Sequence, residues 1–85
     1  MGRKIDKADA YVGKYFTDLR ISHRYTQDQI SEILGISRAT YCTYEIGTRG
    51  LPMKIMKKLC TLYHLNFYKV FEDLDKECEK LGLYE

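Results

Sequence analysis

The sequence is short of the residues that several common classes of protein depend on. It has no tryptophan, one proline and three cysteines among its 85 residues. Cys42, Cys60 and Cys78 form no CxxC pair and have no histidine at metal-ligand spacing, which argues against a zinc site and a disulfide framework. We therefore expect reduced thiols, no metal and no other cofactor.

Long apolar runs are also missing. No stretch approaches the roughly 20 apolar residues of a membrane helix, and residues 1–9 lack the apolar middle of a secretory signal. Hydrophobic residues still make up 45% of the chain and charged residues 31%, as in water-soluble globular domains. We expect one domain over residues 1–85, located in the cytoplasm and without a membrane partner.

An excess of charge of one sign is nearly absent, since the net formal charge is only +2. Residues 1–49 carry eight Lys and Arg against six Asp and Glu, whereas residues 72–85 carry six acids and two lysines. The basic excess lies in the first part of the chain, and the acidic end is expected to avoid a polyanion. Net charge by itself is weak evidence for a nucleic-acid partner.

What the sequence does contain is apolar residues at helical spacing, which predict five helices joined by tight turns. The first helix is expected over about residues 9–23. Pro52 is expected to begin the fourth, because its missing N–H is harmless there, and Asn66 to cap a fifth over about residues 67–81. His64 stands where a helix end usually has glycine, so we expect an awkward backbone conformation at this residue.

Two short helices in the middle of the chain are predicted to form a helix-turn-helix unit. Thr26 can cap the first of them, and Gln29, three residues later, completes a capping box. Gly35 is expected to end that helix in the left-handed conformation, which costs glycine no steric penalty. Ser37 offers a second cap for a helix over residues 38–45, so the intervening turn has about three residues.

This middle segment, residues 26–45, resembles the family of phage repressor and Cro-like (XRE-type) helix-turn-helix proteins. The likeness extends over about residues 12–71, and the cap, the turn glycine, the second cap and the ending Tyr44-Glu45 all occur in register. The resemblance implies an all-α, five-helix, lambda-repressor-like DNA-binding domain. Residues 72–85 would then be a C-terminal helical extension.

The resemblance also implies that the helix over residues 38–45 enters the major groove of double-stranded DNA. Tyr41 and Tyr44 are expected to point inward. Arg38 can hold a guanine with two hydrogen bonds and Ala39 can contact a thymine methyl group. The expected base contacts are Arg38, Ala39, Thr43 and Gln27, and the expected phosphate contacts are Thr26, Thr40, Thr48 and Arg49. For each of them the alternative is an ordinary solvated side chain.

Three departures from the family pattern bear on these expectations, one of them Tyr41 in place of a small aliphatic residue. Ser31 stands where the family prefers alanine, and Pro52 comes one residue later than its commonest place, which affects most the phosphate contacts expected of Thr48 and Arg49. The resemblance further implies that Arg20 pairs with Glu45 inside the domain, where removal of either partner would leave an uncompensated charge.

The end of the fifth helix predicts a partner. Leu74, Cys78 and Leu81 continue a heptad spacing that is typical of a helix seam, and we expect a homodimer through these three residues. The alternative is that this helix end folds back on its own domain. A dimer would present two recognition helices about 34–36 Å apart, which suits a near-palindromic operator.

Taken together, these observations predict a DNA-binding transcription regulator, and a repressor is favoured because the chain leaves no room for an activation or ligand-sensing domain. The alternative is an antitoxin-like protein-interaction module on the same fold. We do not expect an enzyme, because His23 and His64 are far apart in the pattern, no nucleophile stands beside a base and no glycine loop can hold a phosphate. No small-molecule ligand is evident, and the operator and the regulated genes are not readable from the sequence.

Overall fold

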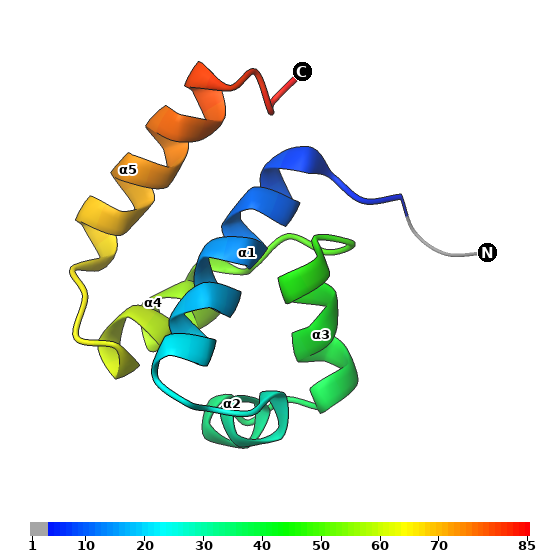
Figure 1. Cartoon of the computed structure of the whole chain (residues 1–85), viewed down its shortest axis with the longest axis vertical. Helices are drawn as coiled ribbons and strands as arrows, with labels where there is room; N and C mark the ends of the chain where they lie inside the picture. The colour runs from blue at the N-terminus through cyan, green and yellow to red at the C-terminus, as the bar shows by residue number, and fades with distance from the viewer. Residues whose placement is uncertain (1–3) are drawn as a thin grey trace.

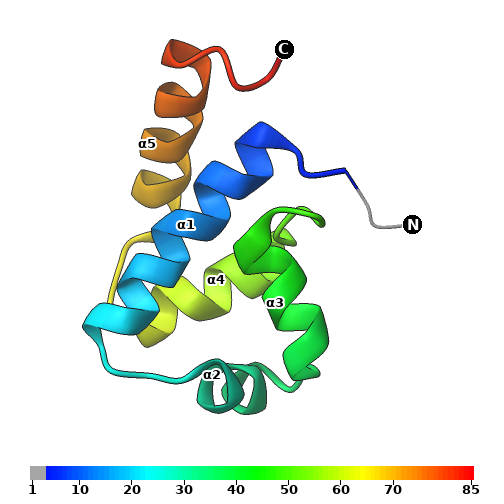
Figure 2. The ribbon, with the colours of Figure 1, turned by 45° about the vertical axis from the view of Figure 1, so that its right-hand side comes forward.

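The computed structural model describes residues 4–85, and these residues form five helices with no strand among them (Figure 1). The expected all-α, five-helix fold is confirmed. Helix α1 crosses the centre of the molecule, with α5 along one side and α3 along the other, while α2 lies across one end (Figures 1 and 2). The five helices are α1 (Lys7–Ser22), α2 (Gln27–Leu34), α3 (Arg38–Ile46), α4 (Met53–Leu62) and α5 (Phe67–Lys80).

The caps around α2 and α3 form as the sequence predicts. Thr26 Oγ1 accepts from the Gln29 amide at 3.1 Å, and Gln29 Oε1 accepts from the Thr26 amide at 2.9 Å, which completes the capping box. Gly35 ends α2 at φ 72°, and the Ser37 hydroxyl caps α3. Because these contacts satisfy amides that the helices leave free, they fix the geometry of the turn between α2 and α3.

Some helix ends differ from the expectation by one or two residues. Helix α1 begins at Lys7 because the Asp6 carboxylate caps it. Helix α4 begins at Met53, since Pro52 has an extended ψ of 147° and occupies the N-cap position instead of the first turn. His64 has a positive φ of 58°, as expected, and the Leu65 amide then donates to the Cys60 carbonyl across the turn.

The core lies where all five helices meet. Phe16 of α1 is 2% exposed, and Tyr41 is the one residue of α3 that is buried. Helix α3 therefore contributes one fully buried side chain to the core, with Tyr44 packed against it, and exposes Arg38, Ala39 and Ile46. The buried cluster consists of Phe16, Ile30, Leu34, Tyr41, Ile55, Met56, Leu59, Cys60, Tyr63, Val70 and Leu74.

Helices α1 and α3 approach each other closely at Gly13. A Cβ atom built on Gly13 would lie 2.5 Å from the carbonyl oxygen of Glu45 and would also collide with the carbonyl oxygen of Tyr44. Only glycine allows the two backbones to come this close. Gly13 thus lets the last turn of α3 rest directly on α1.

Two of the three residues of the C-terminal seam expected from the sequence are buried within the chain's own fold. Leu74 is 6% exposed and Cys78 is 1% exposed, because this face of α5 packs on the chain's own domain, whereas Leu81 is 54% exposed. After α5 the chain turns back at Gly82, and the Tyr84 hydroxyl donates to Asp75 Oδ1 at 2.6 Å. The helix end therefore folds back on the chain's own domain, the alternative left open above.

Candidate nucleic-acid interface

Helix α3 exposes the side that the sequence assigned to base recognition. Arg38 and Ala39 are exposed and Thr43 is half-buried. On the opposite side Tyr41 is 1% exposed and Tyr44 packs against the core. Since an α-helix with its side chains is about 10–12 Å wide, a helix exposed in this way fits the major groove of B-DNA.

Arg38 is only weakly held in the free protein. Its Nε lies 3.7 Å from Asp28 Oδ1, an ion pair across the turn between α2 and α3, and the two side chains are 62% and 73% exposed. Exposed ion pairs of this kind contribute little, so the guanidinium can leave Asp28 for a stronger partner at small cost. The pair keeps the guanidinium of Arg38 beside the turn between α2 and α3 and leaves it exposed.

The remaining threonine candidates already make contacts within the chain. The Thr26 hydroxyl belongs to the capping box, and Thr40 Oγ1 accepts from the Ser37 hydroxyl at 2.9 Å. The Thr43 hydroxyl donates to the Thr40 carbonyl at 2.6 Å, which leaves its oxygen free to accept. Their hydroxyls are thus held in fixed positions on the exposed side of the helix-turn-helix unit.

The loop after α3 is tied to the end of that helix. The amide of Arg49 donates to the Thr43 carbonyl at 3.4 Å, and the Thr48 hydroxyl donates to the same oxygen at 3.5 Å. Thr48 is half-buried, whereas Arg49 is exposed. The backbone of this loop is therefore fixed relative to α3, while the guanidinium of Arg49 remains on the surface.

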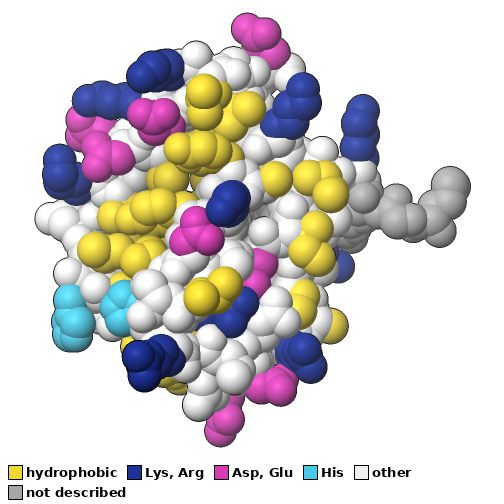
Figure 3. Space-filling view, viewed as in Figure 1, with side chains coloured by type: hydrophobic (Ala, Val, Ile, Leu, Met, Phe, Trp, Pro, Cys, Tyr) yellow, Lys and Arg dark blue, Asp and Glu magenta, His cyan; other side chains and the backbone are white. Residues whose placement is uncertain are grey.

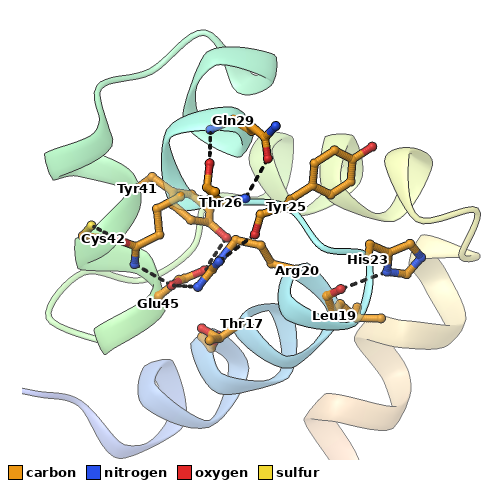
Figure 4. Close-up of polar contacts among 12 residues, drawn as sticks. Thr17, Leu19, Arg20, His23, Tyr25, Thr26, Gln29, Tyr41, Cys42 and Glu45 are labelled. Carbon is orange, nitrogen blue, oxygen red and sulfur yellow. Dashed lines mark hydrogen bonds and ion pairs between the residues drawn. The ribbon is translucent and has the colours of Figure 1, made fainter.

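Behind the exposed face, the carboxylate of Glu45 joins three helices. Arg20 Nε donates to Glu45 Oε2 at 2.7 Å, and the Tyr41 hydroxyl donates to the same oxygen at 2.5 Å. Arg20 also donates to the carbonyl of Tyr25, in the connection between α1 and α2, at 2.8 Å. Figure 4 shows Glu45 of α3 facing Arg20 of α1. The ion pair expected from the resemblance is present, and its side chains are 13% and 7% exposed.

The charges in this cluster stabilise each other. Burial alone would raise the pKa of Glu45, but hydrogen bonds from Arg20, Tyr41 and Gln27 outweigh it and hold the pKa of this carboxyl below its ordinary value. Burial, together with the bond to Glu45, raises the pKa of Tyr41. Glu45 is therefore ionised, and Tyr41 is a neutral donor to it.

Arg20 and Glu45 were expected in this cluster from the sequence, but the contacts of Tyr41, Gln27 and Cys42 were not. Cys42 donates its thiol to Gln27 Oε1 at 3.3 Å, and Gln27 Nε2 donates to Glu45 Oε1 at 2.9 Å. The contact between Tyr41 and Glu45 has a local signal, because residues four apart share one face of a helix. The contacts of Gln27 have none, since they depend on how α2 packs against α3.

Other kinds of site have little support in the part of the chain that the structure describes. Among residues 4–85, no three His, Cys, Asp or Glu side chains are grouped closely enough to bind a metal ion. A surface hollow of about 500 Å³ lies between α2 and α4 and combines apolar side chains with lysines. No helix within these residues has both the length and the apolar character that crossing a membrane requires.

Comparison with known proteins is consistent with this geometry. The model of a family described as helix-turn-helix matches residues 16–69. The chain is 28% identical over 74 residues to the antitoxin PezA of Streptococcus pneumoniae, covering 87% of this chain and 46% of the relative. It is 24% identical over 63 residues to the cryptic phage CTXphi transcriptional repressor RstR of Vibrio cholerae, covering 74% of this chain and 57% of that protein. The chain thus spans about half the length of either relative.

Proposed function

We propose that this chain, which belongs to the helix-turn-helix family of DNA-binding transcription regulators, is a repressor that binds a near-palindromic operator as a dimer. The observation that carries the proposal is the placement of α3, which has one buried residue and an exposed side that begins with Arg38 and Ala39. A rigid helix held in this way can enter the major groove and place side chains on base edges.

The roles of the side chains follow from their positions. Arg38, held only by an exposed pair with Asp28, donates two hydrogen bonds to a guanine, and Ala39 packs on a thymine methyl group. Thr43, whose hydroxyl donates to the Thr40 carbonyl, accepts at the next base edge. The amides at the start of α2 face a phosphate, as helix N-termini do, and the phosphate contacts are completed by Thr26, Thr40, Thr48 and Arg49.

Repression would act by occlusion. A protein seated in the major groove over a promoter prevents polymerase from binding the same DNA. Two copies on the half-sites of one operator bind more tightly than one, because the second contact is made at a high effective concentration. Neutralisation of phosphates by basic side chains releases counterions, so the affinity should fall steeply with salt.

The dimer would use surface that the chain's own fold leaves exposed. Leu81 is the one residue of the expected seam that remains accessible, and Phe71 and Tyr84, also on α5 and the turn after it, are 48% and 58% exposed. Hydrophobic side chains gather on the face that carries α5 (Figure 3). Exposed apolar groups of this kind are typical of a surface that packs against a partner.

Sedimentation tests the dimer directly. The double substitution Leu81→Glu and Tyr84→Glu should shift the chain toward the monomer, and Ile21→Glu, an exposed residue at the far end of α1, is the control. Equal sedimentation of all three proteins would reject dimerisation through this surface.

The experiment that tests DNA recognition is selection of bound sequences from a random pool of double-stranded DNA. We expect one enriched motif with approximate twofold symmetry. A pool without any enriched motif would refute base recognition, and an enriched motif without symmetry would refute the dimeric operator alone.

A second candidate function is that of an antitoxin-like module that neutralises a partner protein. Its support is the likeness to a protein named antitoxin, which extends over 87% of this chain. The two functions differ in what the purified chain does alone. Under the repressor hypothesis it selects a motif unaided, whereas under the antitoxin-like hypothesis specific DNA binding appears only with a copurifying second chain.

A further inference from the structure

The side-chain amide of Gln27 lies between two residues of α3. Its Nε2 donates to Glu45 Oε1 at 2.9 Å, and its Oε1 accepts from the Cys42 thiol at 3.3 Å. With the amide reversed, its carbonyl oxygen would face the ionised Glu45 carboxylate, and two acceptors would meet. The chemistry of the partners therefore determines which way the amide points.

This arrangement differs from that of a glutamine that reads a base. To recognise adenine, a glutamine turns Oε1 and Nε2 together toward the base edge. In Gln27 both atoms are already bonded to side chains of α3. One N–H of the amide remains, and a single donor suits a phosphate oxygen, which carries no sequence information.

The bridge connects the first turn of α2 to the reading side of α3. Cys42 immediately precedes Thr43 and lies one helical turn after Arg38, so its position is coupled to both. Glu45, the other end of the bridge, is held by Arg20 of α1 at 2.7 Å. Helix α3 is thus bonded to α2 through Gln27 and to α1 through the Arg20–Glu45 pair.

We propose that Gln27 is a positioning residue for base recognition, which sets the angle at which α3 presents Arg38 and Thr43 to DNA by bridging Cys42 and Glu45. The inference rests on the proposed function and goes beyond it, because it assigns Gln27 to orientation and not to direct reading. Sites of this kind tolerate misplacement of only about 0.5 Å or 10–20°, so a small tilt of α3 weakens discrimination between bases.

The test compares Gln27→Ala, Cys42→Ala and the double variant. The readout is discrimination, the ratio of Kd for single-base variants of the selected motif to Kd for the motif itself. We expect discrimination at the bases read by α3 to fall about 3- to 10-fold in Gln27→Ala, and to fall also in Cys42→Ala. The double variant should lose less than the product of the single losses, because both substitutions break the same bridge. Cys42→Ser keeps a donor for Gln27 and should retain the discrimination of the unaltered chain.

Gln29→Ala is the matched control. Gln29 belongs to the same helix, and its side chain also makes a hydrogen bond within the chain, but its partner is the backbone amide of Thr26 in the capping box. Its loss should lower the melting temperature and leave the selected motif unchanged. Discrimination, unlike melting temperature, is not moved by a role in stability alone.

Three results would overturn the inference. If Gln27→Ala relaxes the preference at one base pair and Cys42→Ala acts independently, Gln27 reads that base itself. If Gln27→Ala weakens all sequences equally, it contributes a phosphate contact and nothing more. A motif that survives Gln27→Ala with unchanged discrimination would refute the positioning role, whereas an unaltered chain that selects no motif would refute the proposed function itself.

Discussion

Arg20 and Glu45 are 25 positions apart in the chain, yet Arg20 Nε lies 2.7 Å from Glu45 Oε2 and both side chains are largely buried. The pair joins the last turn of α1 to the end of α3. Because Glu45 also accepts from Tyr41 and Gln27, its carboxylate satisfies donors from three helices. The same group therefore determines both the stability of the domain and the placement of the proposed reading helix.

We predict that Glu45→Ala destabilises the protein by about 3–5 kcal/mol, since it leaves the Arg20 guanidinium buried without its partner. Asp28→Ala, which removes the exposed pair with Arg38, should change stability by less than about 0.5 kcal/mol. Thermal unfolding followed by circular dichroism measures both. Equal melting temperatures for the two variants would show that the buried Glu45 pair contributes no more to stability than the exposed Asp28 pair.

Acid should destabilise the protein through Glu45. The folded pKa of this carboxyl lies below the ordinary value of 4.5, so the unfolded chain binds the proton first as the pH falls. The stabilisation is complete above the unfolded pKa and is lost as the pH falls from about 4.5 through the folded pKa. Urea unfolding at a series of pH values should show this loss in the unaltered chain and a shallower dependence in Glu45→Gln. Parallel pH profiles would contradict the assignment.

Two buried tyrosines should respond in opposite ways to loss of the hydroxyl. The Tyr41 hydroxyl donates to Glu45, whereas that of Tyr63 is buried without a hydrogen-bond partner among the described residues. Tyr41→Phe should cost about 1.5–3 kcal/mol, as for a bond to a charged group, while Tyr63→Phe should be neutral or stabilise by up to about 1 kcal/mol. Burial raises the pKa of Tyr63 to about 12, so its hydroxyl is neutral near pH 7. Chemical denaturation measures the free energy of unfolding of both variants. A larger loss of stability in Tyr63→Phe than in Tyr41→Phe would contradict the prediction.

Most features predicted correctly from the sequence are those that neighbours within a few residues determine; the Arg20–Glu45 pair, 25 positions apart, was expected only from the family resemblance. The capping box of Thr26 and Gln29, the left-handed Gly35 and the Ser37 cap each depend on a contact no more than three positions away. Such signals are independent of how helices pack. They were sufficient to place the helix-turn-helix unit, whereas the exposed side of α3 was expected from the resemblance and from the spacing of Tyr41 and Tyr44.

The features that the sequence did not reveal depend on packing. The spacing of Leu74 and Cys78 defines one face of a helix, but it does not say whether that face meets a second copy or the chain's own core. The bridge from Gln27 to Cys42 exists only at one crossing angle of α2 and α3. Gly13, in the middle of α1, gives no local sign that another backbone lies against it.

Gly13→Ala should destabilise the protein although alanine is the better helix former by about 1 kcal/mol. The added Cβ would meet backbone carbonyl oxygens of α3, which cannot turn away as a flexible side chain can. We expect a net loss of about 1–3 kcal/mol, typical of an overpacked interface. Lys14→Ala, at an exposed position of the same helix, is the control and should change little. A more stable Gly13→Ala variant would show that α1 and α3 can separate freely.

Arg38 and Arg49 should differ in how their loss affects DNA binding, although both are exposed and neither substitution should lower the melting temperature. Under the proposed function Arg38→Ala would remove two hydrogen bonds to a guanine, so it should cost about 1–3 kcal/mol on the selected motif and relax the preference at that base pair. Arg49→Ala would remove the proposed phosphate contact, so it should weaken all sequences alike and reduce the slope of log K against log salt by about 0.9. Titrations of labelled duplexes at several salt concentrations separate the two effects. If Arg38→Ala weakened motif and unrelated DNA equally, Arg38 would be a phosphate contact and the reading side of α3 would have to lie elsewhere.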